Sequence, residues 1–151
     1  SEQKRKVVEK YNPELIINYQ EENLRETVEA HFGKRPVNIF YDQVGGQAYD
    51  EGVKLLSSEG RALIVGFASG NIPSQLLSYL LVKNITIMGV FMISFEDNDK
   101  DYLKSRIELI FEHYRNKKIE PVFEIIDFQK IIEYLDLIGS RKTVGRIVAV
   151  K

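Results

Sequence analysis

The stretch RALIVGFASG, residues 61–70, joins an apolar run to a loop built mainly of glycine, alanine and serine. The run at residues 62–65 lacks polar alternation, which is typical of a strand buried on both faces in a parallel sheet. Small residues follow at once, and they let another molecule approach the backbone closely. The stretch therefore predicts a parallel sheet with a ligand at the carboxyl end of one strand.

Apolar segments alternate with amphipathic segments along the rest of the chain. The extended segments predict about six strands, at residues 15–17, 37–42, 61–66, 85–92, 119–126 and 146–150. The helical periods predict helices at residues 2–11, 21–31, 45–56, 74–82 and 99–114, and a last helix capped by Asp127. This alternation predicts an α/β fold with a doubly wound, mostly parallel sheet covered on both faces.

Composition narrows the class of protein. The chain has 151 residues, 44% of them hydrophobic, which suits one soluble globular domain. Its net charge of -1 gives no sign of binding to nucleic acid or to an anionic membrane. It has no cysteine and only two histidines, His31 and His113, so we expect neither a disulfide nor a zinc site. No signal peptide or membrane span is recognisable, so we expect the cytoplasm or a mitochondrial or peroxisomal matrix.

Three short loops are expected at the carboxyl edge of the sheet. They follow the first three expected strands, at residues 18–19, 42–46 (DQVGG) and 66–70. Ligands of such sheets bind beyond this edge, so the three loops form the candidate site. The structural alternative is that the glycines only form tight turns between strands and helices. Asp42, at a strand end, is expected to cap a helix or a turn.

Five segments, in order and with matching spacings, carry a family resemblance. They are VVEKYNPELIINYQEENLRETV (7–28), NIFYDQVGG (38–46), GRALIVGFASGNIP (60–73), LLVKNITIMGVF (80–91) and GSRKTVGRIVAVK (139–151). The chain resembles the second half of the zinc-less quinone oxidoreductases of the medium-chain dehydrogenase/reductase superfamily. The resemblance covers essentially the whole chain.

The resemblance implies a Rossmann-like NAD(P)-binding domain, partial, at residues 1–118, and a C-terminal segment, residues 119–151, that returns to the substrate domain. It also implies NADPH as the cofactor, no zinc, and hydride transfer to a quinone or an α,β-unsaturated carbonyl. A homodimer through the strand at residues 85–92 is implied as well. The natural acceptor stays open.

The resemblance further implies which residues contact the cofactor. Lys4 and Tyr19 bracket the 2'-phosphate, and a charge and a hydroxyl suit that group. The remaining contacts are Gln43 and Val44 at the adenine side, Gly66, Phe67 and Ala68 at the nicotinamide, Phe91 near the carboxamide, and Arg141 at a phosphate. A solvated helix lysine, an amphipathic strand-end tyrosine and a surface arginine are the alternatives for Lys4, Tyr19 and Arg141.

The chain departs from the family in two respects. No G-x-G-x-x-G occurs in it, so the first strand, the glycine-rich turn and the first helix are missing, and so is the N-terminal substrate domain. We therefore expect a fragment of a reductase, or a natural truncation, that is inactive alone. The alternative is a non-catalytic cofactor-binding or dimerisation module. A receiver-like or flavodoxin-like domain is disfavoured, because residues 15–17 lead into Asn18 and Tyr19 rather than into the acidic residues of a magnesium site.

Overall fold

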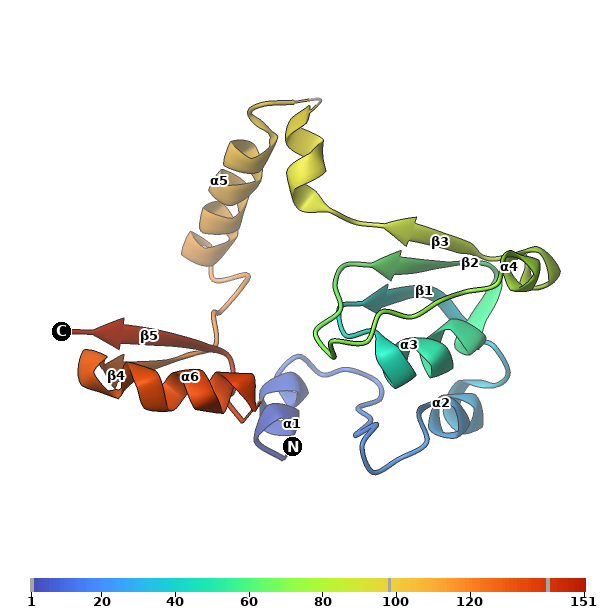
Figure 1. The fold of residues 1–151 in the computed structure, drawn as a ribbon, viewed down its shortest axis with the longest axis horizontal. Helices are drawn as coiled ribbons and strands as arrows, with labels where there is room; N and C mark the ends of the chain where they lie inside the picture. The colour runs from blue at the N-terminus through green and yellow to red at the C-terminus, as the bar shows by residue number, and fades with distance from the viewer. Residues whose placement is uncertain (1, 98, 141) are drawn as a thin grey trace. The chain divides into compact units, whose positions relative to one another are not determined.

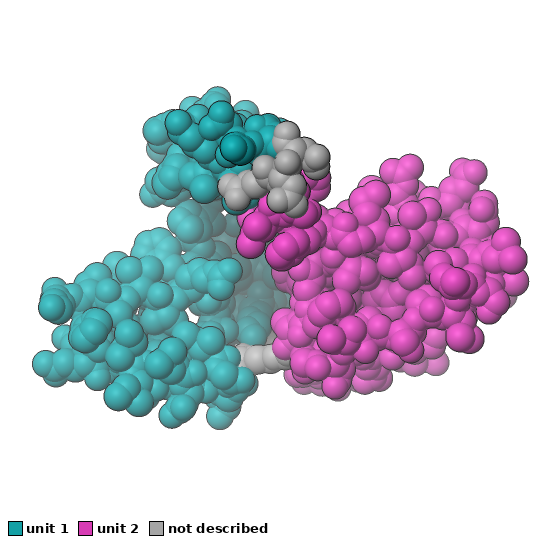
Figure 2. Space-filling view, turned by 45° about the horizontal axis from the view of Figure 1, so that its top comes forward, with its two compact units in different colours: residues 1–14, 99–151 teal, residues 15–98 magenta. Residues whose placement is uncertain are grey.

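The computed structural model describes residues 2–97, 99–140 and 142–151. They belong to two compact units, unit 1 with residues 1–14 and 99–151 and unit 2 with residues 15–98 (Figure 2). The expected division into a partial NAD(P)-binding domain (1–118) and a C-terminal segment (119–151) is a division by function, and it stays a prediction. No helix in the described ranges is long and apolar enough to cross a membrane.

Unit 2 is built on a three-stranded parallel sheet in the order β1-β2-β3 (Figure 1). The strands are β1 (Val37–Asp42), β2 (Leu56–Ile64) and β3 (Thr86–Gly89). Asp42 pairs with Ile64, and Ile64 pairs with Gly89. The carboxyl ends of all three strands therefore lie in one row, and the loops that follow them leave the same edge of the sheet.

The helical elements of unit 2 include the connections between its parallel strands, which short hairpins cannot make. They are α2 (Leu24–Phe32), α3 (Gly46–Gly52), the 3-10 turn η1 (Val53–Leu55), α4 (Leu77–Lys83) and the 3-10 turn η2 (Met92–Asp97). Asn23 caps α2, because its side-chain oxygen accepts a hydrogen bond from the Glu26 amide at 3.1 Å. Gly33 ends the same helix with a positive φ of 88°.

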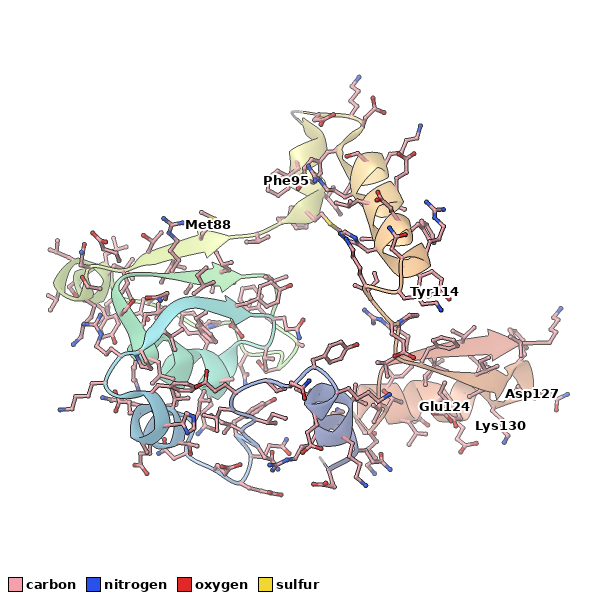
Figure 3. The ribbon with its side chains drawn as sticks, turned by 180° about the vertical axis from the view of Figure 1, so that it is seen from behind. Met88, Phe95, Tyr114, Glu124, Asp127 and Lys130 are labelled. Carbon is pink, nitrogen blue, oxygen red and sulfur yellow. The ribbon has the colours of Figure 1, made fainter. Side chains whose placement is uncertain are left out.

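The core of unit 2 lies between α3 and one face of the sheet. Tyr49 and Val53 are buried there together with Leu56, Ala62 and Ile85. The other face of the sheet carries exposed side chains, among them Ile39, Tyr41 and, on β3, Met88 (Figure 3).

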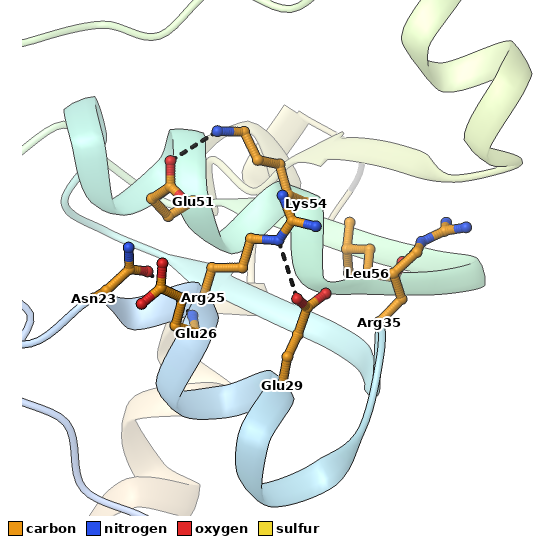
Figure 4. A network of polar contacts seen from close by, with 8 residues as sticks. All are labelled: Asn23, Arg25, Glu26, Glu29, Arg35, Glu51, Lys54 and Leu56. Carbon is orange, nitrogen blue, oxygen red and sulfur yellow. Dashed lines mark hydrogen bonds and ion pairs between the residues drawn. The ribbon is translucent and has the colours of Figure 1, made fainter.

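Arg35 ties together the edge of unit 2 opposite to the carboxyl ends. Its guanidinium donates to the carbonyl of Leu56 at 2.7 Å and to that of Lys83 at 3.0 Å. The first bond holds the start of β2, where Figure 4 shows Arg35 beside Leu56, and the second satisfies a carbonyl at the end of α4. Arg35 thus stabilises unit 2 away from the three loops.

Unit 1 contains a second parallel pair of strands, β4 (Phe123–Asp127) and β5 (Arg146–Val150). Its helical elements are α1 (Glu2–Glu9), α5 (Tyr102–Arg115), the 3-10 turn η3 (Phe128–Lys130) and α6 (Ile131–Gly139), of which η3 and α6 form the crossover between the two strands. Asp127, on β4 (Figure 3), accepts a hydrogen bond from the Gln129 amide at 2.7 Å and so caps η3, which leads directly into α6. The N-cap of α6 itself is Lys130, so the predicted cap lies one short turn earlier than expected.

A tyrosine–glutamate contact joins α6 to β4. The Tyr134 hydroxyl donates to Glu124 at 2.5 Å. This hydrogen bond raises the pKa of Tyr134, because it stabilises the protonated phenol.

The predicted parallel pairing is confirmed, and β1 has the predicted bounds. Several element predictions were wrong: the strand expected over residues 61–66 is β2 (Leu56–Ile64), and the strand expected over residues 119–126 is β4 (Phe123–Asp127). Residues 15–17 form no strand, because they pair with no strand among the described residues. The helix expected over residues 45–56 ends its α-helical part at Gly52, because Leu56 instead pairs with Val37 and begins β2. The strand expected over residues 85–92 ends at Gly89, since the chain turns into η2.

Candidate functional site

The candidate site is the loop-bearing rim at the carboxyl ends of β1, β2 and β3. The Val65 amide donates to the carbonyl of Asp42 at 2.8 Å, and the Val90 amide donates to the carbonyl of Ile64 at 2.9 Å. The first residue of the loop after β2 is thus bonded to β1, and the first residue of the loop after β3 is bonded to β2. Of the three loops expected at this edge, the two that follow β1 and β2 lie together, as the strand register requires. Residues 18–19 follow no strand in the described part of the chain, so their expected place at this edge was wrong.

Three backbone hydrogen bonds join the β1 loop to the β2 loop. The Ala68 amide donates to the carbonyl of Gln43 at 3.1 Å, and the Ser69 amide donates to that of Val44 at 2.8 Å. The Gly46 amide donates to the carbonyl of Asn71 at 3.1 Å. The two loops therefore form one cross-linked rim.

Two glycines of the rim serve different purposes. Gly45 has a φ of 71°, and a Cβ added there would lie 2.7 Å from the carbonyl oxygen of Asn71, so only glycine fits between the loops. A Cβ added at Gly66 would meet only the carbonyl oxygen of Gln43, at 3.6 Å. Gly45 is thus required by packing within the protein, whereas Gly66 leaves the rim open to another molecule.

The structure brings five of the predicted site residues together. They share the cross-linked rim: Gln43, Val44, Gly66, Phe67 and Ala68.

The other predicted site residues lie outside the two cross-linked loops. Phe91 follows β3 and is 66% exposed. Tyr19 lies in the turn before α2 in unit 2, whereas Lys4 lies on α1 in unit 1. Arg141 lies outside the described residues.

Tyr19 borders a small pocket of about 150 Å³ in unit 2. The pocket lies between the start of α2 and the first turns of α3, and its lining residues are Tyr19, Glu22, Asn23, Leu24, Gln47, Ala48 and Glu51.

Both carboxylates of this pocket already have partners. Glu22 accepts the Asn18 amide at 3.0 Å. Glu51 pairs with Lys54 at 2.7 Å (Figure 4). The pocket offers hydroxyl, amide and carboxylate groups, and this chemistry suits hydroxyl or amino groups better than a bare anion.

Sequence reasoning assigned Asp42 only to a cap or a turn, and the turn is confirmed. Its carboxylate accepts hydrogen bonds from the amides of Val44 and Gly45. The Tyr49 side chain lies in the same core, and burial, followed by the nearby charge of Asp42, raises the pKa of this phenol above its ordinary value.

Sequence reasoning missed Ser69 and the acidic lining of the pocket. The Ser69 hydroxyl accepts the Asn71 amide at 3.1 Å and so shapes the β2 loop. The sequence Ser69-Gly70-Asn71 consists of residues that favour turns, and it could have indicated this one. Glu22 and Glu51 gave no signal, because their shared pocket joins segments far apart in the chain.

Residues 1–110 match the family of zinc-binding dehydrogenases. This match spans more than half of the chain. The protein belongs to the zinc-binding dehydrogenase family. The described residues of this family member contain no group of three or more histidine, aspartate or glutamate side chains that could hold a metal ion. Zinc independence stays a prediction.

Curated relatives of this dehydrogenase-family chain support the predicted quinone oxidoreductase resemblance. The chain is 28% identical over 149 residues to quinone oxidoreductase-like protein 2 of Mus musculus. This match covers 98% of this chain and 43% of that protein. It is 27% identical over 144 residues to the homologue in Nematostella vectensis, covering 94% and 40%. The chain therefore spans about two fifths of the length of these relatives.

Solved structures establish the fold. Quinone oxidoreductase from Escherichia coli, complexed with NADPH, matches with a TM-score of 0.76 and 20% identity, over 89% of this chain and 42% of that one. CurA from Vibrio vulnificus, in complex with NADPH, matches with a TM-score of 0.72 and 15% identity, over 100% and 48%. The predicted α/β fold is thus confirmed, with parallel sheets that match the C-terminal part of a Rossmann-like domain.

Proposed function

We propose that this chain is part of an NADPH-dependent, zinc-independent oxidoreductase that reduces a quinone or an α,β-unsaturated carbonyl, and that it is inactive alone. The observation that carries the proposal is the cross-linked rim, where Gly66 leaves the backbone open beside Phe67 and Ala68. Membership of the dehydrogenase family and the names of the relatives support it.

The rim suits the nicotinamide end of a dinucleotide. A flat ring needs backbone that no side chain covers, and the space over Gly66 meets this need. Phe67 and Phe91 are 40% and 66% exposed, so their rings are available to cover a bound ring and exclude water. The nicotinamide supplies the hydride when it is bound. The chain's part is to orient that group and keep water from it.

The first test is a calorimetric titration of the 151-residue chain with NADPH and with NADH. We expect NADPH to bind, and Lys4→Ala and Tyr19→Phe each to weaken its affinity about tenfold, because a charged and a hydroxyl contact to the phosphate are lost. NADH lacks this phosphate, so its affinity is expected to be the same in all variants.

Matched controls are available in the same chain. Lys10 and Tyr11 are exposed residues just beyond α1, so Lys10→Ala and Tyr11→Phe should leave NADPH affinity unchanged. Absence of NADPH binding by a folded chain would contradict the proposed cofactor function. Equal effects of the control and test variants would contradict the assignment of Lys4 and Tyr19.

The acidic pocket beside Tyr19 gives a second prediction on cofactor choice. If the 2'-phosphate lies near Tyr19, the Glu51 carboxylate opposes it, although Lys54 at 2.7 Å offsets part of that charge. Glu51→Gln removes the negative charge and releases Lys54. We expect NADPH affinity to rise about fivefold, since nearby charges at a protein surface interact by roughly 1 kcal/mol or more.

The control for this prediction is Glu26→Gln on α2. Glu26 is exposed and does not line the pocket, so its neutralisation changes the net charge equally while leaving the charges of the pocket lining unchanged. Equal gains in both variants would indicate a general charge effect. An unchanged NADPH affinity in Glu51→Gln would place the phosphate away from Tyr19.

The second candidate function is a non-catalytic dimerisation module. The strand β3 lies at an edge of its sheet among the described strands, and an exposed edge favours pairing with another chain. On α4, Leu77 and Leu81 are 80% and 83% exposed. We propose a homodimer through residues 85–92, which sedimentation of the chain tests. A dimer that binds neither cofactor would favour this candidate, whereas a monomer that binds NADPH would exclude it.

A further inference from the structure

Asp42 is a charged residue in the interior of unit 2. Its side chain is on the core face at the end of β1, and the residue is 3% exposed. A carboxylate this far from water is costly unless hydrogen-bond donors surround it. The donors that compensate for its burial therefore show what the carboxylate holds in place.

Those donors are the backbone amides of the turn that follows β1. Oδ1 accepts from the Val44 amide at 2.9 Å and from the Gly45 amide at 3.1 Å, and Oδ2 accepts from the Gly45 amide at 3.2 Å. Hydrogen bonds to a charged acceptor are roughly twice as strong as those between neutral groups.

The same two peptide groups are bonded on their opposite side. The Val44 amide shares a peptide plane with the carbonyl of Gln43, and this carbonyl accepts the Ala68 amide. The Gly45 amide shares a plane with the carbonyl of Val44, which accepts the Ser69 amide. No peptide bond in the described chain is cis, so in each plane the amide and the carbonyl point in opposite directions.

We propose that Asp42 is a positioning residue, whose carboxylate sets the place of residues 66–69 through these two peptide planes. By fixing the amides of Val44 and Gly45, it aims the two carbonyls at the β2 loop. Asp42 itself is buried, so its part is to position the loop. Its relevance to catalysis rests on the proposed function, because the loop it positions is the one assigned to the nicotinamide end.

The test compares amide hydrogen exchange in the full chain with Asp42→Asn and Asp42→Ala. The measured quantity is the exchange rate of the Ala68 and Ser69 amides relative to the β2 amides that bond to β3. We expect this ratio to rise about tenfold in Asp42→Ala, which removes all three acceptor contacts. Asp42→Asn keeps one acceptor oxygen and should raise the ratio by a smaller factor, about threefold.

Two control variants separate positioning from general loss of stability. Arg35→Ala weakens unit 2 at its opposite edge, so it should speed exchange of loop and strand amides together. Asp127→Asn alters a similar strand-end aspartate that accepts the amide two residues later, but in unit 1, so it should leave the ratio unchanged.

NADPH titration of the same variants completes the test. We expect NADPH affinity to fall in the order wild type, Asp42→Asn, Asp42→Ala. An unchanged exchange ratio in both Asp42 variants would overturn the inference, as would a ratio that rises equally in Arg35→Ala. If the exchange ratio rises in the Asp42 variants but the wild-type chain does not bind NADPH, the result would support the positioning role and overturn the proposed function instead.

Discussion

Replacing Gly45 with alanine is expected to lower the free energy of unfolding of unit 2 by about 2–5 kcal/mol. Two effects add. The positive φ of 71° is unfavourable for any residue with a Cβ, and the added atom would lie 2.7 Å from the carbonyl oxygen of Asn71. That carbonyl accepts the Gly46 amide, so it cannot move away without breaking the contact between the loops. Denaturant unfolding, with hydrogen exchange of β2 amides to report on unit 2, measures the loss.

Gly70→Ala is the matched control for Gly45→Ala. Gly70 has a φ of 81° in the same rim, but a Cβ added there would meet nothing within 4 Å. Gly70→Ala should therefore lower the free energy of unfolding only through the unfavourable positive φ, by about 1–2 kcal/mol. The difference between the two variants measures the contact between the loops. Equal losses would show that Gly45 is needed only for its φ, and that the packing of the rim is looser than these distances imply.

The strands of unit 2 were predictable where local pattern and tertiary pairing agree. VNIFYD has the apolar, β-branched and aromatic residues of a strand, and β1 has the predicted bounds. The start of β2 was not predictable, because residues 56–60 are mostly polar and small. Leu56 is extended there through pairing with Val37, a contact between distant parts of the chain, and the register then shifts before Ile39 pairs with Arg61. The reverse occurs at residues 15–17, which have a strand's composition but no paired neighbour in the described structure.

The site was predictable at the level of topology. Parallel strands bring their following loops to one edge, so the proximity of DQVGG to GFASG followed from the order of elements. The role of Asp42 needed coordinates, because it depends on the direction of two peptide planes. The sequence also indicated two glycine-bearing loops without distinguishing their purposes. Only the surroundings show that Gly45 is enclosed while Gly66 is open.

Gly145→Ala is expected to have a comparably large effect in unit 1. Gly145 has a φ of 74° directly before β5, and a Cβ added there would lie 2.6 Å from the carbonyl carbon of Val122 and press on its oxygen. The same oxygen accepts the Arg146 amide at 2.9 Å, which is the bond that starts the pairing of β5 with β4. The obstructing atoms are backbone, so no side-chain rotation relieves the contact.

We expect Gly145→Ala to destabilise the β4–β5 pair by about 3 kcal/mol or more, because the cost of the positive φ adds to that of separating two strands at their first bond. Hydrogen exchange of the amides in β4 and β5 measures it. Gly139→Ala is the control, since Gly139 ends α6 with nothing within 4 Å of an added Cβ, and alanine favours the helix by about 1 kcal/mol. Protection of β4 and β5 equal to wild type in Gly145→Ala would mean that the strands pair without the close approach of residues 122 and 145. In that case the register of this sheet would be set by its interior pairs alone.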